Sequence, residues 1–311
     1  MSRGSAGRQG LPSGFPVLEP ASYGTGHTMT RVSTNNANAH PIGLEHLSLY
    51  EDPVAVFVDA AAAGGAASVC LSVNHPDMLD REARRDVRAR ITDLDLRISM
   101  GDGFLLNADA GLGGLERQLA LLVELGSPLA NTCAFEPDEN APRDPNRIQD
   151  LLGEFCRLAA QADVGVLIEF TPLSHVPTLA SAVELVGALA QPNLTIMVDT
   201  LHLARAGEGP DDIAQVDPAL FGYCQVSDGP TGFDGLAAYM EEAIYQRAIP
   251  GTGELPLERV LSLLPRDITV SAEVPSRTLK VDGISSHERA RRVLEGSRQV
   301  LARSRDEAAS L

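Results

Sequence analysis

Leu194-Thr195-Ile196-Met197-Val198-Asp199 is a mostly apolar run that ends on a polar, metal-binding type of side chain, and three other runs share this form. Short runs of this kind are typical of buried strands in a parallel sheet, which is apolar on both faces. An acid inside a core is costly, so repeated polar ends indicate a functional edge. The four runs are Val164–Ile168 followed by Glu169, Leu194–Val198 followed by Asp199, Phe221–Cys224 followed by Gln225, and Ile268–Ala272 followed by Glu273.

Strand and helix signals alternate from about Ile42 onward, which is the pattern of repeated βα units. Eight strands are expected, the number found in a (β/α)8 barrel, and 311 residues accommodate one such barrel of about 250 residues with tails. The strands are predicted at 43–50, 67–73, 94–100, 129–135, 164–168, 194–198, 221–224 and 268–272. We therefore predict an α/β chain with one barrel domain over 39–311, ending in a charged helix, after a flexible N-terminal arm over 1–38.

The spacing of the four strand ends agrees with consecutive barrel units. Asp199 follows Glu169 by 30 residues, and Gln225 follows Asp199 by 26, close to the roughly 31 residues of one unit. Glu273 follows Gln225 by 48 residues, so this unit carries an insertion. Long βα loops in barrels commonly cover the site, and we expect the same here.

Composition excludes several classes of protein. The net charge of −17 argues against a nucleic-acid partner, which needs a basic face, and against docking on anionic lipid. No run reaches the roughly 18 to 20 apolar residues of a membrane span. The four cysteines show no C-x-x-C spacing and suit a reducing compartment, so a cytoplasmic location is expected. The single lysine, Lys280, follows the last predicted strand, which argues against Schiff-base chemistry, since that needs a buried amine facing the substrate.

The polar ends are of the type that binds a hard divalent cation. Carboxylate and amide oxygens are the ligands that such ions prefer, and the C-terminal ends of barrel strands are where active sites lie. Other interpretations stay open from the residues alone. Glu169 and Glu273 could pair with arginines, Asp199 could cap the turn that follows it, and Gln225 could be a neutral residue of the barrel interior.

Five motifs give the second half of the chain a resemblance to a known family. They resemble the sugar phosphate isomerase/epimerase group of the xylose isomerase-like TIM-barrel superfamily. That group includes hydroxypyruvate isomerases, ketose 3-epimerases and inosose dehydratases, and more distantly endonuclease IV. The motifs are I-E-F-T-P (168–172), V-D-T-L-H (198–202), Q-V-S-D (225–228), R-A-I-P-G-T-G-E-L-P-L (247–257) and A-E-V (272–274).

The resemblance implies one divalent metal ion, Mn²⁺, Mg²⁺ or Co²⁺, held by Glu169, Asp199, Gln225 and Glu273. It also implies that the two glutamates act as acid and base on either side of the substrate. Many members of the group have His where this chain has Gln225, and Gln is similar to the hydroxypyruvate isomerase branch. An amide oxygen in place of imidazole moves the preference toward harder ions.

The resemblance extends to residues that would hold the substrate. His202 and Arg247 would bind substrate oxygens, although His202 could instead be a hydrogen-bond partner within its loop and Arg247 could form a surface ion pair. His175 stands where epimerases of the group often place a substrate-binding acid, so its type departs from the pattern. His75 ends the second predicted strand and could reach the mouth of the barrel.

These residues imply a metal-dependent isomerase or epimerase that acts on a small keto sugar or keto acid through an enediolate. The alternative on the same scaffold is a lyase, which would dehydrate an inosose-like ring or eliminate a group from a 3-keto glycoside. A third possibility, of another class, is a non-catalytic binding or structural subunit. We expect a small-molecule partner and no nucleic acid or membrane, with homo-oligomer formation left open.

Overall fold

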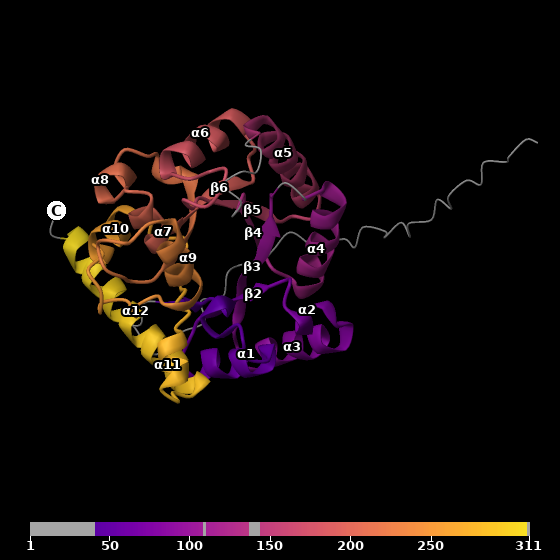
Figure 1. Cartoon of the computed structure of the whole chain (residues 1–311). Helices are drawn as coiled ribbons and strands as arrows, with labels where there is room; N and C mark the ends of the chain where they lie inside the picture. The colour runs from indigo at the N-terminus through magenta and orange to yellow at the C-terminus, as the bar shows by residue number, and fades with distance from the viewer. Residues whose placement is uncertain (1–40, 108–109, 137–143, 310–311) are drawn as a thin grey trace, which may run out of the picture. The chain divides into compact units, whose positions relative to one another are not determined.

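The computed structural model describes residues 41–107, 110–136 and 144–309, and the arm predicted over 1–38 lies outside them. Within the described residues, eight parallel strands close into a barrel in sequence order, β1 to β8. Helices surround the barrel (Figure 1), so the predicted (β/α)8 fold is confirmed. No helix of the described chain is long and apolar enough to cross a membrane.

The strands are short, and their order leaves no open edge. Each strand pairs in parallel with its neighbours, and β1 closes the ring against β8. The strands are β1 (Gly43–Leu44), β2 (Ser68–Ser72), β3 (Arg97–Leu105), β4 (Leu129–Cys133), β5 (Gly165–Glu169), β6 (Leu194–Asp199), β7 (Phe221–Val226) and β8 (Thr269–Ala272).

The helices follow the strands around the outside of the ring. The long α12 packs against α1 and α10, which closes the outer layer where the first and last units meet. The helices are η1 (His46–Leu49, 3₁₀), α1 (Val54–Ala63), α2 (Pro76–Leu79), α3 (Arg81–Asp93), α4 (Leu112–Leu125), α5 (Pro145–Gln161), α6 (Leu179–Leu189), α7 (Thr200–Arg205), α8 (Pro210–Ile213), η2 (Pro218–Leu220, 3₁₀), α9 (Leu236–Tyr245), α10 (Leu257–Leu263), α11 (Arg277–Val281) and α12 (Ser286–Ala309).

The first predicted strand, 43–50, is wrong beyond Leu44. The segment His46–Leu49 alternates like a strand in sequence but forms the 3₁₀ helix η1. The turn is fixed by Ser48, whose hydroxyl donates to the carbonyl of Ala272 (3.4 Å) and accepts from the backbone N–H of Val274 (2.9 Å). This side chain satisfies backbone groups that a longer strand would have paired.

The third predicted strand, 94–100, starts too early and ends too soon, because Gly101 and Gly103 suggested a loop. Both glycines lie inside β3. A Cβ at Gly101 would come within 2.0 Å of Leu122 on α4, and Gly103 has a φ of +108°. The pairing with β4 shifts register between Gly101 and Phe104. The glycines therefore mark an irregular strand that a helix approaches closely.

Side-chain alternation explains why the strand ends point into the barrel. Leu167, Met197 and Tyr223 pack together inside the barrel with Cys70 and Met100. Successive side chains of a strand point to opposite faces, so residues two positions apart share a face. Glu169, Asp199 and Gln225 each lie two positions after a member of this apolar layer. They form a polar layer directly above it, at the C-terminal end of the barrel.

Candidate metal and substrate site

The structure brings the four strand-end residues together. Asp199 and Gln225 are direct Cα partners across β6 and β7, so they lie at the same level of the barrel. Glu169 is the last residue of β5, and Glu273 directly follows β8. All four side chains are buried. Parallel register and inward alternation are enough to make them converge at one end of the ring.

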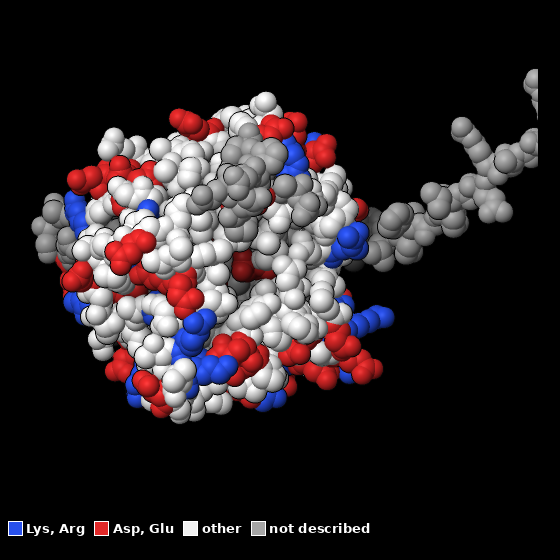
Figure 2. Space-filling view, viewed as in Figure 1, with Lys and Arg blue, Asp and Glu red and all other residues white. Residues whose placement is uncertain are grey.

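A cavity of about 240 Å³ opens above these residues. Glu169, Gln225 and Glu273 line it, together with His202 and Arg247. Figure 2 shows a hollow near the centre of this face with acidic side chains at its floor. The helix α9, in the long segment between Gln225 and Glu273, contributes four further lining residues. They are Tyr239, Met240, Ala243 and Ile244. The insertion therefore forms one wall of the cavity.

Arg247 is a buried cation between two of the acids. Its Nη1 lies 2.5 Å from Asp199 Oδ2, and its Nη2 lies 2.9 Å from Glu273 Oε2. Its Nε donates to the carbonyl of Ala243 at the end of α9. The predicted alternative of a surface ion pair is wrong, because the side chain is only 2% exposed. Burial alone would lower the pKa of Arg247, but the carboxylates of Asp199 and Glu273 outweigh burial and raise it.

Asp199 both ends β6 and begins α7. Its Oδ1 accepts hydrogen bonds from the backbone N–H groups of Leu201 and His202, at 2.8 and 3.1 Å. The capping role that the sequence left open is therefore present. Burial would raise the pKa of Asp199, but the neighbouring Arg247 and His202 lower it. The cap occupies Oδ1. The other oxygen, Oδ2, contacts Arg247 and lies 3.9 Å from His202 Nε2.

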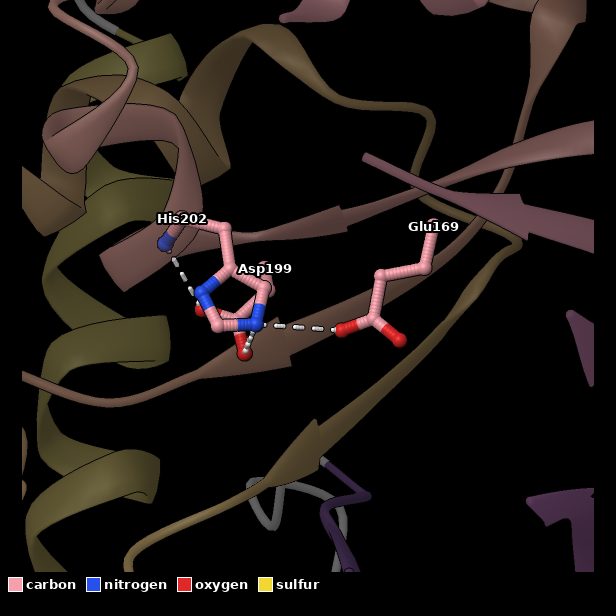
Figure 3. Close-up of side chains that lie close together, drawn as sticks. All are labelled: Glu169, Asp199 and His202. Atoms are coloured by element: carbon pink, nitrogen blue, oxygen red, sulfur yellow. Dashed lines mark hydrogen bonds and ion pairs between the residues drawn. The ribbon is translucent and has the colours of Figure 1, made fainter. Parts of the chain in front are cut away.

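His202 lies between Glu169 and Asp199, with its ring turned toward both (Figure 3). Its Nε2 is 3.3 Å from Glu169 Oε1 and 3.9 Å from Asp199 Oδ2. Its Nδ1 is 2.7 Å from the hydroxyl of Tyr239 on α9, which in turn bonds Thr171. This contact fixes the ring and directs Nε2 at the acids. One ligand atom from each of Glu169, Asp199 and His202 lies within 4.8 Å of the others, so the three could hold a metal ion.

Gln225 supplies a further test of the fit to a metal. Its Nε2 donates to Glu45 Oε2 (3.2 Å) and to Glu273 Oε1 (3.1 Å). A carboxylate accepts hydrogen bonds and does not donate them, so Glu45 and Glu273 orient the amide nitrogen of Gln225 toward themselves and its oxygen away from them. Among the described residues, the buried Oε1 has no hydrogen-bond partner. A buried acceptor with no partner beside several carboxylates is what an oxygen ligand of a hard cation requires, so the donor set fits one.

Four members of the cluster were not predicted. Glu45 follows β1, and it accepts hydrogen bonds from Tyr223 (2.7 Å) and Gln225. Asn131 on β4 donates to both Asp102 (3.2 Å) and Glu169 (2.9 Å). Tyr239 orients His202. Glu45 carried the same signal as the others, an acid at the end of an apolar run, but the strand prediction extended past it.

The cluster carries more negative charge than its own residues balance. It contains the carboxyl groups of Glu45, Asp102, Glu169, Asp199 and Glu273, and Arg247 pairs with two of them, Asp199 and Glu273. Burial, Glu169 and Glu45 raise the pKa of Asp102 to about 7. Burial likewise raises the pKa of Glu45 and of Glu273, although Arg247 opposes the change at Glu273. A bound divalent cation would instead lower the pKa values of these carboxyl groups, because it favours their ionised forms.

The loop after Arg247 is built around Asp228. The carboxylate of Asp228 accepts from the backbone N–H groups of Gly251, Gly253 and Leu255, at 2.9 to 3.1 Å. A Cβ at Gly253 would lie 2.3 Å from Asp228 Oδ1, so only glycine fits there. The Q-V-S-D and P-G-T-G motifs are therefore two halves of one structural unit, which holds Arg247 over the strand ends.

The other two predicted substrate residues lie away from the cavity. His75 caps α2, where its Nδ1 accepts from the backbone N–H of Asp77 (3.2 Å), and its ring contacts His46 and Tyr50. His175 lines a separate hollow beside α5 and α6. Neither is among the residues that line the cavity above the acids.

Comparison with known proteins identifies the fold family. The family description "Xylose isomerase-like TIM barrel" matches residues 58–300. The chain belongs to this family. A 3-dehydroshikimate dehydratase of Bacillus anthracis is 33% identical over 105 residues, which are 33% of this chain and 36% of that protein. The match thus spans little more than a third of the relative's length.

Solved structures agree on the fold. IolI, solved with a bound zinc atom, superposes with a TM-score of 0.72 at 15% identity and covers 84% of this chain and 98% of its own. D-psicose 3-epimerase superposes with a TM-score of 0.66 at 18% identity, covering 84% and 99% of the two chains. At these identities the likeness shows the fold, and the chemistry must be argued from the site.

Proposed function

We propose that this protein is a divalent-metal-dependent isomerase or epimerase of a small keto sugar or keto acid. The observation that carries the proposal is that Glu169, Asp199, Gln225 and Glu273 lie at the C-terminal ends of four consecutive strands, and that the buried Gln225 oxygen has no hydrogen-bond partner among the described residues. Those four residues would hold the ion, although the three ligand atoms that lie within 4.8 Å of one another belong to Glu169, Asp199 and His202. A divalent cation, when bound, would stabilise the negative charge that develops on the substrate oxygens as an enediolate forms. Isomerases and epimerases share removal of a proton from the carbon beside a carbonyl.

Two glutamates with separate environments support the two proton transfers. Glu169 is held by Asn131 and lies beside His202, whereas Glu273 is held by Arg247 and Gln225. A proton removed by one carboxylate could thus be returned by the other from a different direction. Burial raises the pKa of Glu273, so its carboxyl group holds a proton more readily than an exposed glutamate does.

Arg247 and His202 would place the substrate. Both line the cavity, and both combine a fixed position with hydrogen-bond donors or acceptors. Arg247 is fixed by Asp199 and Glu273, and His202 by Tyr239. Substrate oxygens bound by groups that are already fixed lose little additional side-chain freedom, which favours a single reactive orientation.

A lyase is the second candidate, and the relative that acts as a dehydratase favours it. Dehydration of a 3-keto or inosose-like ring begins with the same proton removal beside the carbonyl. The second glutamate would then protonate a departing hydroxyl in place of returning a proton to carbon. The residues required are the same, so the reaction product separates the two candidates.

Paired substitutions test the proposal. Glu273→Gln and Glu169→Gln keep an oxygen near the metal but remove the acid–base group, and we expect each to lower kcat by at least about 100-fold, the lower scale of general-base catalysis. Metal content, measured on the same samples, should stay near that of the unsubstituted protein. Turnover close to wild type in both variants would show that the proton transfers occur elsewhere.

A further inference from the structure

A second, larger cavity adjoins the one above the acids. Its volume is about 380 Å³, and it lies among η1, α9, α11 and α12. Two half-buried apolar side chains, Leu47 from η1 and Ile244 from α9, line both cavities. They form a sill between them, so a molecule that spans the two cavities would lie across Leu47 and Ile244. We call the second space the outer cavity.

Two tyrosine rings that line the outer cavity are held by contacts with neighbouring side chains. Tyr50 is 36% exposed, and its ring contacts those of His46 and His75, at centroid distances of 5.4 and 5.1 Å. Tyr245 is 42% exposed, and the guanidinium of Arg277 lies 3.9 Å from its centroid. Rings that are fixed before binding lose little entropy when a ligand packs on them. Exposed aromatic rings in a cleft suit the apolar face of a sugar or aryl ring.

The charged groups of the outer cavity are already paired. Lys280 and Arg289 both contact Glu51, at 3.2 and 2.8 Å, and Arg289 also contacts Asp52 at 3.1 Å. Arg277 lies 2.5 Å from Glu241. In Figure 2, blue and red side chains lie side by side below and to the left of the central hollow, on the side where Figure 1 labels α11. An anionic ligand would have to compete with these carboxylates for the same cations, so the paired charges favour a neutral group.

We propose that the outer cavity binds a second, non-reacting ring of the substrate, a neutral glycosyl or aryl group that packs against Tyr50 and Tyr245. This rests on the proposed function, because the reacting keto unit must occupy the cavity above the acids. The substrate is then a ring-bearing keto compound such as a keto glycoside, larger than a free keto sugar. The position of His75 follows from the same arrangement, since it supports the ring of Tyr50.

Matched probes test the proposal. The affinities of 3-ketoglucose, phenyl 3-keto-β-glucoside and a 3-keto disaccharide are measured by titration calorimetry with Mn²⁺-loaded protein, and turnover is followed separately. We expect the two-ring probes to bind at least about tenfold more tightly than 3-ketoglucose, the scale of one good ring contact. Tyr50→Ala combined with Tyr245→Ala should abolish this difference while leaving the affinity for 3-ketoglucose unchanged.

The matched control replaces both residues with Phe, which keeps the rings and should keep the advantage of the two-ring probes. The phenyl and disaccharide arms show which kind of ring the cavity takes. Equal affinity for one-ring and two-ring probes, or an advantage that survives the double Ala substitution, would overturn the inference even if all probes are turned over. Turnover of none of the probes, with the binding difference intact, would count against the proposed function and leave the outer cavity as a ring-binding site.

Discussion

Replacement of Arg247 by Met is the perturbation with the largest expected effect on the folded state. Arg247 bonds Asp199 at 2.5 Å and Glu273 at 2.9 Å, and neither carboxylate has more than 6% of its side chain exposed. Methionine fills part of the same volume but leaves both acids without their cation. Removal of one partner of a buried ion pair typically costs about 3 to 5 kcal/mol, because the remaining charge stays buried.

The assay is urea unfolding at 25 °C and pH 7 with excess chelator. Arg247→Met should lower the free energy of unfolding by about 3 to 5 kcal/mol. The matched control is Arg303→Met, which breaks the exposed pair between Arg303 and Glu258 at 2.7 Å. Exposed pairs contribute about 0 to 1 kcal/mol, so the control should change little.

A second stage of the same experiment adds Mn²⁺. If the carboxylates around Arg247 bind the ion, Mn²⁺ at about 100 times its Kd should stabilise the variant by about 2.7 kcal/mol. A loss below about 1 kcal/mol in chelator, equal to that of the control, would refute the view that Arg247 balances buried carboxylates. Absence of any Mn²⁺ effect in both the variant and the parent protein would refute the metal site.

Three further predictions concern the ligand cluster. Purified protein loaded with Mn²⁺ should retain about one ion per chain by elemental analysis and lose it to chelator, because the donor set is a single cluster; retention of two or more ions would contradict this. Gln225→Leu should weaken Mn²⁺ binding at least about tenfold more than Gln225→His, which supplies a nitrogen donor. Equal Mn²⁺ affinities of the two variants, measured by calorimetry, would show that Gln225 is a residue of the barrel interior and not a metal ligand. Burial raises the pKa of Asp102 to about 7, so the folded chain binds this proton more tightly than the unfolded chain does. The free energy of unfolding in chelator should therefore fall as pH rises from about 4 to 7. Asp102→Asn should flatten that fall, and an unchanged pH profile in the variant would contradict the shift.

The sequence predicted the four strand-end residues because the signals are local. An apolar run fixes each strand, and alternation fixes which side chain points inward, as in β5 and β6. Glu169 and Asp199 were therefore placed within one residue of their observed strand ends.

The residues that were missed depend on contacts between distant parts of the chain. Glu45 was hidden because His46–Leu49 alternates like a strand, although Ser48 turns it into a 3₁₀ helix. Asn131 is read as an ordinary strand residue until β3 and β5 bring Asp102 and Glu169 to either side of it. His75 was expected at the end of the second strand, but β2 ends at Ser72 and the ring nitrogen of His75 caps α2.

The most direct test of the central claim is proton exchange between substrate and solvent. The claim is that a carboxylate of the cluster removes a proton from the carbon beside the substrate carbonyl. A keto-sugar substrate incubated with Mn²⁺-loaded protein in D₂O should gain deuterium at that carbon, in recovered substrate or in product, and Glu273→Gln should slow this gain by at least about 100-fold. Complete conversion with no solvent deuterium at several pH values would indicate a hydride shift and contradict the carboxylate mechanism.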